Sequence, residues 1–381
     1  MSPVDTTVSS TPASTRRGLD DPRRAGSGGR LMRRVWALLL VCCSWLAGWG
    51  LPAQAAETDL TAEILTAGAD CLRIDGGCDG PGIWEALAAK AKGRKLQFDL
   101  RGPEISLNEV QIDAPRLHQG GEFYLSRDLT RGKARRRLRA PEVTLTHPEV
   151  LAHLKVGSEV RIDQGKLRAL VTEVEDGRAL CEVQMLRPKG LRLKPGRTVS
   201  LPQVDLSIPA LTQWDIEALG HAMRYADVIG FGFVQTVEDV AALITAMEIA
   251  AQACGRQDLP AIMLRIETPA ALRNLPELIV AAGGRVPVGV MIARSDLADD
   301  IGIERLWEIQ EELLWLCEAA EVPVVWATQV LDGMLQDGTP SRVESHDAAM
   351  SQRAECVMLG KGPHIVGTVR YLRAQLERMD R

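Results

Sequence analysis

Two apolar runs decide how this chain folds, Pro287-Val-Gly-Val-Met-Ile-Ala-Arg294 and Pro323-Val-Val-Trp-Ala-Thr328. Both are short and rich in β-branched residues, which is typical of buried strands. The residues between them, 303–319, repeat apolar side chains at helical spacing. A strand, a helix and a second strand in this order predict a βαβ unit with parallel strands.

The same unit recurs along most of the chain. Further buried strands are expected at residues 71–75, 96–100, 226–234, 261–266 and 355–359, and further helices at residues 59–68, 237–253 and 365–379. One more strand near residues 47–51 brings the number of strands to eight. Eight successive βα units predict an α/β fold of the closed (β/α)₈ type, the TIM barrel, rather than an open sheet.

One segment interrupts this rhythm. Residues 104–205 lack a strong helical pattern, alternate Val and Leu with polar residues, and carry turn signals at several glycines. This pattern predicts a small all-β domain inserted into the barrel. The expected division is residues 1–45 as a disordered and hydrophobic N-terminal segment, 46–103 as the first part of the barrel, 104–205 as the insertion and 206–381 as the remainder.

The N-terminal region supports two readings that exclude each other. Met32-Arg33-Arg34, an apolar run and a small-residue end near Ala55 have the form of a secretory signal. Cleavage there would remove the expected strand at residues 47–51, which the closed barrel needs. We favour the strand and a cytoplasmic protein, with export or membrane anchoring through residues 32–56 as the alternative.

Composition excludes some classes of function. The chain has 381 residues, a net charge of −5 and only 4% aromatic residues, which argues against nucleic-acid binding. Its eight cysteines form no CxxC pair, so we expect reduced structural thiols. Residues 131–139 carry six basic side chains. They form either a solvated hairpin loop or a guide for an anionic ligand.

Polar residues gather where the expected strands end. The ends carry four acids, an arginine and a threonine: Arg73, Asp75, Asp99, Glu267, Asp296 and Thr328. The carboxyl ends of barrel strands meet at one rim, where active sites of this fold lie. Glu267 and Asp296 supply hard oxygen ligands for Mg²⁺ or Mn²⁺. Arg73 and Arg265 can hold a phosphate or carboxylate group.

The sequence resembles the pyruvate kinase family at several motifs in the right order. Met291-Ile-Ala-Arg-Ser-Asp-Leu-Ala298 is similar to the family's metal-binding loop, and Leu264-Arg-Ile-Glu267 to its Lys-Ile-Glu motif. The resemblance continues in Ala327-Thr-Gln329, in Pro340-Ser-Arg-Val-Glu344 and in the last strand. Upstream, Leu72-Arg-Ile-Asp75 and Phe98-Asp-Leu-Arg-Gly-Pro-Glu104 are similar to further family motifs.

The resemblance implies a reaction and a role for each matching residue. The reaction transfers the phosphoryl group of phosphoenolpyruvate to ADP, giving pyruvate and ATP through a metal-stabilised enolate. Glu267 and Asp296 match the Mg²⁺ or Mn²⁺ ligands, Thr328 and Ser295 match substrate contacts, and Arg73 matches a phosphate contact. Asp75 and Asp99 match a monovalent-cation site, which would hold K⁺.

The chain departs from the family at several of these positions. Arg265 stands where the family has a phosphate-bridging lysine, and a planar guanidinium replaces a compact ammonium. Asp75 replaces an asparagine, Gly77 a serine, Leu100 a common threonine and Ser295 a glycine. Gly360-Lys361-Gly362 replaces the usual Ser-Gly-Glu. The family's C-terminal effector domain is expected to be absent.

Three functions therefore remain open. The first is a pyruvate-kinase-like phosphotransferase acting on phosphoenolpyruvate and ADP, which Arg265 would weaken. The second is a metal-dependent lyase or aldolase acting on pyruvate-type enolates, which needs neither lysine nor nucleotide. The third is a catalytically silent binding protein of the same fold. The sequence allows a homo-oligomer for each of them.

Overall fold

The barrel closes through eight parallel strands. The structure, a computed structural model, describes residues 38–42, 53–77, 80–91, 93–111, 116–130, 138–163, 165–186, 188–202 and 208–379. The strands follow the order β1-β17-β16-β15-β14-β13-β3-β2 around the closed barrel. They are β1 (Leu38–Cys42), β2 (Cys71–Asp75), β3 (Lys95–Asp99), β13 (Val228–Phe231), β14 (Ala261–Ile266), β15 (Val288–Ala293), β16 (Val324–Ala327) and β17 (Cys356–Leu359). The predicted (β/α)₈ fold is confirmed.

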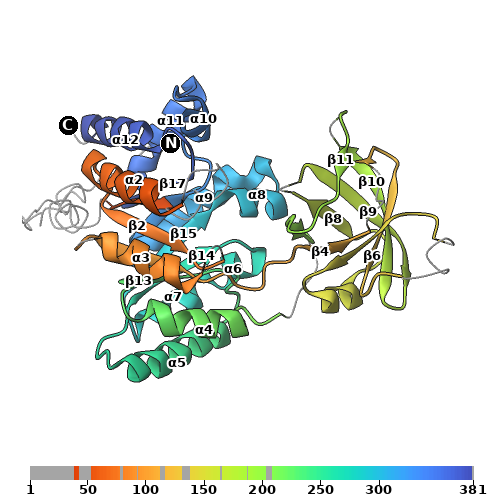
Figure 1. Cartoon of the computed structure of the whole chain (residues 1–381), viewed down its shortest axis with the longest axis horizontal. Helices are drawn as coiled ribbons and strands as arrows, with labels where there is room; N and C mark the ends of the chain where they lie inside the picture. The colour runs from red at the N-terminus through yellow and green to blue at the C-terminus, as the bar shows by residue number, and fades with distance from the viewer. Residues whose placement is uncertain are drawn as a thin grey trace, which may run out of the picture. The chain divides into compact units, whose positions relative to one another are not determined.

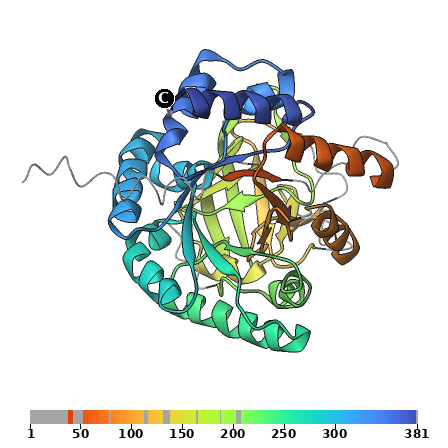
Figure 2. The same cartoon turned by 90° about the vertical axis from the view of Figure 1, so that its left-hand side faces the viewer.

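Helices follow the strands and surround them, as the end-on view in Figure 2 shows. They are α2 (Ala53–Ala67), α3 (Pro81–Ala91), α4 (Gln213–Ala222), α5 (Val237–Cys254), α6 (Pro269–Arg273), α7 (Leu275–Gly283), α8 (Arg294–Ile301), α9 (Ile303–Ala319), α10 (Asp332–Asp337), α11 (Arg342–Met350), the 3₁₀ turn η5 (Ser351–Arg353) and α12 (Ile365–Met379). Among the described residues, no helix is long and apolar enough to cross a membrane.

The first strand of the barrel lies at another place than the sequence predicts, within residues 1–45, which were expected to precede the barrel. The stretch expected to form it, residues 47–51, lies outside the described residues. The strand in that position is β1, earlier in the same apolar run, and it pairs with β17 on one side and β2 on the other. An unbroken apolar run has no internal period that would distinguish one five-residue window from the next, so the prediction was misplaced along it.

The segment expected as an insertion forms its own sheet (Figure 1). Seven strands pair in the order β12-β8-β9-β10-β6-β7-β4, and β11 pairs with β5. The elements are β4 (Leu107–Val110), β5 (Arg116–Leu117), β6 (Glu122–Ser126), β7 (Glu142–Leu145), η4 (Pro148–His153), β8 (Glu159–Ile162), β9 (Leu167–Glu175), β10 (Arg178–Leu186), β11 (Leu191–Arg192) and β12 (Val199–Ser200). Its buried apolar residues form a cluster separate from that of the barrel.

A buried carboxylate ties the start of the insertion to the helix that follows it. Asp215 lies in the first turn of α4, where it forms a capping box with Thr212. Its second oxygen, Oδ1, accepts hydrogen bonds from the backbone amides of Arg101 (2.8 Å) and Gly102 (3.2 Å). The side chain is fully buried, so both oxygens have to be satisfied inside the protein. Asp215 therefore fixes the loop that follows β3 and leads out of the barrel.

We predict that Asp215→Ala destabilises the protein by about 3 kcal/mol, because hydrogen bonds to a buried charged group are lost together with the helix cap. Asp239→Ala is the matched control, since Asp239 forms the same capping box with Thr236 in α5 but is only partly buried, and its contact with another segment of the chain, at the backbone amide of Ala210, is long at 3.5 Å. The control should lose about 1 kcal/mol. Urea unfolding measures both, and equal losses would contradict the second role of Asp215.

Candidate active site

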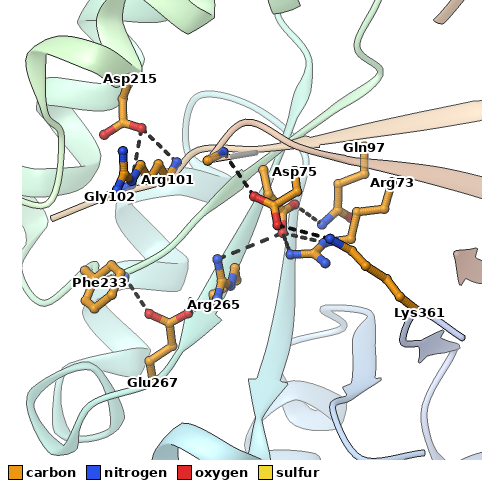
Figure 3. A network of polar contacts seen from close by, with 12 residues as sticks. Arg73, Asp75, Gln97, Arg101, Gly102, Asp215, Phe233, Arg265, Glu267 and Lys361 are labelled. Carbon is orange, nitrogen blue, oxygen red and sulfur yellow. Dashed lines mark hydrogen bonds and ion pairs between the residues drawn. The ribbon is translucent and has the colours of Figure 1, made fainter. Parts of the chain in front are cut away.

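A network of charged side chains lies at the rim formed by the strand ends, and its centre is Asp99. Oδ2 of Asp99, the last residue of β3, accepts a hydrogen bond from Nε of Arg73 at 2.6 Å, and Nη2 of Arg73 lies 2.5 Å away. Oδ1 accepts a hydrogen bond from the amide of Gln97 at 2.6 Å. Nη1 of Arg265, in β14, lies 4.0 Å from Oδ2 (Figure 3). Side chains from the three strands β2, β3 and β14 thus meet at one carboxylate.

The two arginines keep the carboxyl group of Asp99 ionised. Burial by itself raises the pKa of Asp99, but the charges of Arg73 and Arg265 outweigh it and hold the pKa below its usual value. The side chain is completely buried. A buried carboxylate that stays ionised needs such partners, because an isolated charge in the protein interior is very costly.

Glu267 follows β14 directly and faces the same network. Its Oε1 forms an ion pair with Nη2 of Arg265 without hydrogen-bond geometry. Its Oε2 accepts a hydrogen bond from the backbone amide of Phe233 at 3.0 Å. Phe233 has a positive φ of 56°, and a Cβ on Gly102 would meet its ring at 2.5 Å. The absence of a side chain at Gly102 therefore leaves room for the Phe233 ring.

Glu267 and Asp296 suit a divalent cation. Burial raises the pKa of Glu267 to about 7, the charge of Arg265 partly offsets this, and the charge of Asp296 adds to it. Such a pair of carboxylates favours a counter-cation, and Mg²⁺ is commonly held by one or two carboxylates together with substrate oxygens. The described part of the chain contains no group of three or more acids, histidines or cysteines that could hold a metal. The remaining ligands would thus come from substrate, water or the backbone.

A missing side chain at Gly232 leaves space for Arg265. A Cβ at this position would lie 3.2 Å from Nη1 of Arg265 and 3.3 to 3.4 Å from the two carboxylate oxygens of Glu267. Burial lowers the pKa of Arg265, but the charges of Glu267 and Asp99 outweigh it and raise the pKa above its usual value. Arg265 is therefore charged, and it fits its position without displacing the backbone.

Thr328 and Ser295 form a second cluster at the rim. The backbone amide of Ser295, after β15, donates to Oγ1 of Thr328, after β16, at 3.1 Å. Asp296 is next to Ser295 in the first turn of α8, and its side chain is exposed. Thr328 has a positive φ of 64°. The structure therefore brings Thr328 and Ser295 into contact. The hydroxyl of Ser295 donates to Oδ2 of Asp296 at 3.3 Å, and the charge of Asp296 acts on Glu267.

Arg294 holds this second cluster in place, a role that the sequence did not reveal. Its guanidinium donates to the carbonyl oxygens of Ala327 (3.0 Å) and Thr328 (2.6 Å). The same group forms a two-point contact with Asp347 of α11, at 2.6 and 3.0 Å. It also stacks over the ring of Trp326 at 4.8 Å. Arg294 thereby ties β16 to α11 and supports the strained backbone at Thr328.

Three further residues at the rim were not assigned from the sequence. Nζ of Lys361, two residues after β17, lies 3.9 Å from Oδ2 of Asp75. Glu104 is influenced by the same charges: burial raises its pKa, Arg101 lowers it, and Asp75 and Asp296 raise it further. Gln97 could have been found, because residues two apart in a strand face the same side and Asp99 was already assigned.

Several known proteins are similar to this chain. A family model described as "Pyruvate kinase, barrel domain" matches residues 83–364. The pyruvate kinase of Methylorubrum extorquens is 36% identical over 293 residues, which are 74% of this chain and 56% of that protein. The pyruvate kinase of Corynebacterium glutamicum is 30% identical over 294 residues, 74% of this chain and 58% of that protein. The pyruvate kinase of Mycobacterium tuberculosis is 28% identical over 300 residues, which are 76% of this chain and 59% of that protein. The chain thus spans less than two thirds of the length of these relatives.

We predict that Mn²⁺ raises the thermal unfolding midpoint of the parent protein, and that Glu267→Gln and Asp296→Asn each abolish this rise. The physical reason is that a ligand bound only by the folded state stabilises it, by about 2.7 kcal/mol at a hundredfold excess over Kd. Glu238→Gln, an exposed acid in the first turn of α5, is the control and should respond like the parent. If both site variants also respond like the parent, these acids do not bind the metal.

We predict that Asp99→Asn costs about 3 kcal/mol at neutral pH, since it removes the negative charge beside the largely buried guanidinium of Arg73. The pKa of Asp99 is lower in the folded than in the unfolded state, so its stabilising effect is complete above the usual aspartate value, about pH 4, and declines below it. The difference in unfolding free energy between parent and variant should therefore stay constant from neutral pH to about pH 5 and narrow only in stronger acid. Asp258→Asn, at an exposed ion pair, should change stability little at any pH.

Proposed function

Because the chain belongs to the pyruvate kinase family, we propose that it is a pyruvate-kinase-like phosphotransferase acting on phosphoenolpyruvate and ADP. The observation that carries this proposal is the network at the strand ends, where Arg73, Asp99, Arg265 and Glu267 form one continuous chain of opposite charges. It offers guanidinium groups for a phosphate and a carboxylate for a divalent cation at the same rim.

In the proposed reaction the bond between phosphorus and the enol oxygen of phosphoenolpyruvate breaks, and a bond to a β-phosphate oxygen of ADP forms. The enolate that is left takes a proton at its terminal carbon and becomes pyruvate. Mg²⁺ or Mn²⁺, bound through Glu267 and Asp296, would supply positive charge for the phosphate oxygens and the developing enolate oxygen. Positioning and charge carry most of the catalysis, because the protein forms no covalent bond to the substrate.

The arginines and Thr328 have the remaining roles in the proposed reaction. Arg265 supplies charge next to the transferring phosphoryl group, and the ion pair with Asp99 orients Arg73 toward the phosphate. Oγ1 of Thr328 accepts the backbone amide of Ser295, so its own proton is directed to another acceptor. We assign to Thr328 and Ser295 the carboxylate of the substrate, and to the hydroxyl of Thr328 a part in delivering the proton to the enolate.

The position of the strand β1 favours a cytoplasmic protein. This strand lies inside the apolar run that could serve as a secretory signal. Cleavage near Ala55 would remove it and leave β17 and β2 without the strand that joins them. The proposed substrates are also intracellular metabolites, which agrees with the same location.

A second candidate, a catalytically silent binding protein, is favoured by the ion pair between Arg265 and Glu267. A guanidinium in contact with Glu267 competes with a divalent cation for the same carboxylate. It also makes a fixed two-point contact with a phosphate, whereas an ammonium can follow the phosphoryl group as a point charge. Both proposed functions include the binding of phosphoenolpyruvate, but only the phosphotransferase turns it over.

We predict that the parent protein forms pyruvate slowly from phosphoenolpyruvate and ADP, and that Arg265→Lys raises kcat by about tenfold or more. A misplacement of about 1 Å at a reacting group costs on the order of 100-fold in rate, and lysine can follow the phosphoryl group as a point charge where the guanidinium fixes it at two points. A coupled assay of pyruvate formation with Mg²⁺ measures this, and the Kd for Mn²⁺ should change by less than about twofold, since lysine keeps a positive charge beside the same carboxylates.

Arg285→Lys is the matched control, because Arg285 is an exposed arginine paired with Glu248 that precedes β15, at the opposite end of this strand from the rim. It should leave the rate unchanged. A parent turnover of about 10 s⁻¹ or more, with no gain from lysine, would show that the site has adapted to arginine. Binding of phosphoenolpyruvate without turnover in either form would establish the silent binder instead.

A further inference from the structure

The two acids that match a monovalent-cation site carry cations of the protein itself. Asp75 and Asp99 are register neighbours at the ends of β2 and β3, so their carboxylates belong to the same part of the rim. The oxygens of Asp99 accept hydrogen bonds from Arg73 and Gln97, both at 2.6 Å. Each oxygen of Asp99 is thus engaged by a donor on the chain, and its charge is compensated by a guanidinium.

The negative charge of Asp75 is compensated by a lysine near the other end of the chain. Its Oδ1 accepts the backbone amide of Gly77 at 3.0 Å, and its Oδ2 lies 3.9 Å from the ammonium of Lys361. Lys361 follows β17, which is separated from β2 in the barrel by β1. Its side chain therefore reaches past the end of one strand, and Figure 3 shows it directed toward Asp75 and Arg73.

The neighbouring groups do not suit K⁺. A cation of this kind is held by several oxygen atoms. Gly77 offers no hydroxyl, and its amide is a donor to Asp75. The side chain of Leu100 is apolar and buried, and its backbone amide donates to the carbonyl oxygen of Gly230 at 2.9 Å. Positions 77 and 100 thus offer no side-chain oxygen, and two cations of the chain, Arg73 and Lys361, lie beside the two acids.

We propose that Lys361, together with Arg73, takes the place of a bound monovalent cation, so that the site needs no K⁺. The ammonium is attached to the barrel, so it neutralises Asp75 without the loss of translational freedom that a free ion would undergo. It then lies beside the arginines that would bind the phosphate, and adds positive charge to the same rim. The role in substrate binding rests on the function proposed above, whereas the replacement of K⁺ does not.

The primary test is the thermal unfolding midpoint in KCl compared with tetramethylammonium chloride at equal ionic strength. Tetramethylammonium is too large for an ion site, so the difference reports specific K⁺ binding. The parent should show no difference. Lys361→Met leaves Asp75 without its ammonium and should gain a rise of about 2 °C in K⁺, as expected for a newly bound stabilising ion.

Two further variants control for the charge and for the loss of a lysine. Lys361→Arg keeps a cation beside Asp75 and should behave like the parent. Lys166→Met removes a lysine whose ammonium lies 3.3 Å from Asp163 in the inserted sheet, and it should also show no K⁺ response. If Lys361→Met does not fold, Lys361→Gln replaces it. A K⁺-dependent midpoint in the parent, or none in the variants without the ammonium, overturns the proposal.

A second measurement separates this proposal from the proposed function. The Kd for phosphoenolpyruvate in the presence of Mn²⁺, measured by calorimetry, should be the same in both salts for the parent. For Lys361→Met it should be about tenfold weaker in tetramethylammonium and recover in K⁺. A protein without turnover or without affinity for phosphoenolpyruvate would contradict the proposed function, while the unfolding midpoints would still decide whether Lys361 replaces K⁺.

Discussion

The arrangement of the rim depends on the buried charge of Asp99. A carboxylate with no exposure to solvent stays ionised only if cations and donors surround it, and Arg73, Gln97 and Arg265 do so from three strands. Each of these side chains is thereby held in one orientation. The same requirement explains why the strand ends carry arginines next to acids, and why a ligand meets a preformed set of charges.

Arg265 connects this buried charge to Glu267, and the functional question centres on that connection. Arg265 faces Asp99 on one side and Glu267 on the other, so a change in its position would affect both carboxylates. The space left by Gly232 accommodates the guanidinium and the carboxylate together. The site is therefore consistent within itself, although it differs from the lysine-based arrangement implied by the resemblance to the family. Local agreement among neighbouring residues of this kind is expected of a natural, minimally frustrated sequence.

Most of the barrel could be predicted because its signals are local. The strands β2 and β14 and the helices α9 and α12 have the predicted bounds, since an apolar run or a helical period ends where the element ends. The first strand was misplaced, because the apolar run that contains it has no internal boundary. The position of the candidate site residues at the rim could be predicted for a related reason: a polar residue that ends a buried parallel strand lies at the rim.

The sequence by itself determined the barrel, the segment that departs from it and the set of polar residues at its rim. Only the tertiary structure decided which cation pairs with which acid. Lys361 and Asp75 come from opposite ends of the chain, and Arg294 reaches both Thr328 and Asp347 from a third segment. Such pairings depend on the closure of the barrel and on the reach of each side chain. The strand order of the closed barrel brings the ends of β17, β1 and β2 together in space. The periodicity of the sequence shows where each strand lies along the chain, but not which strands are neighbours.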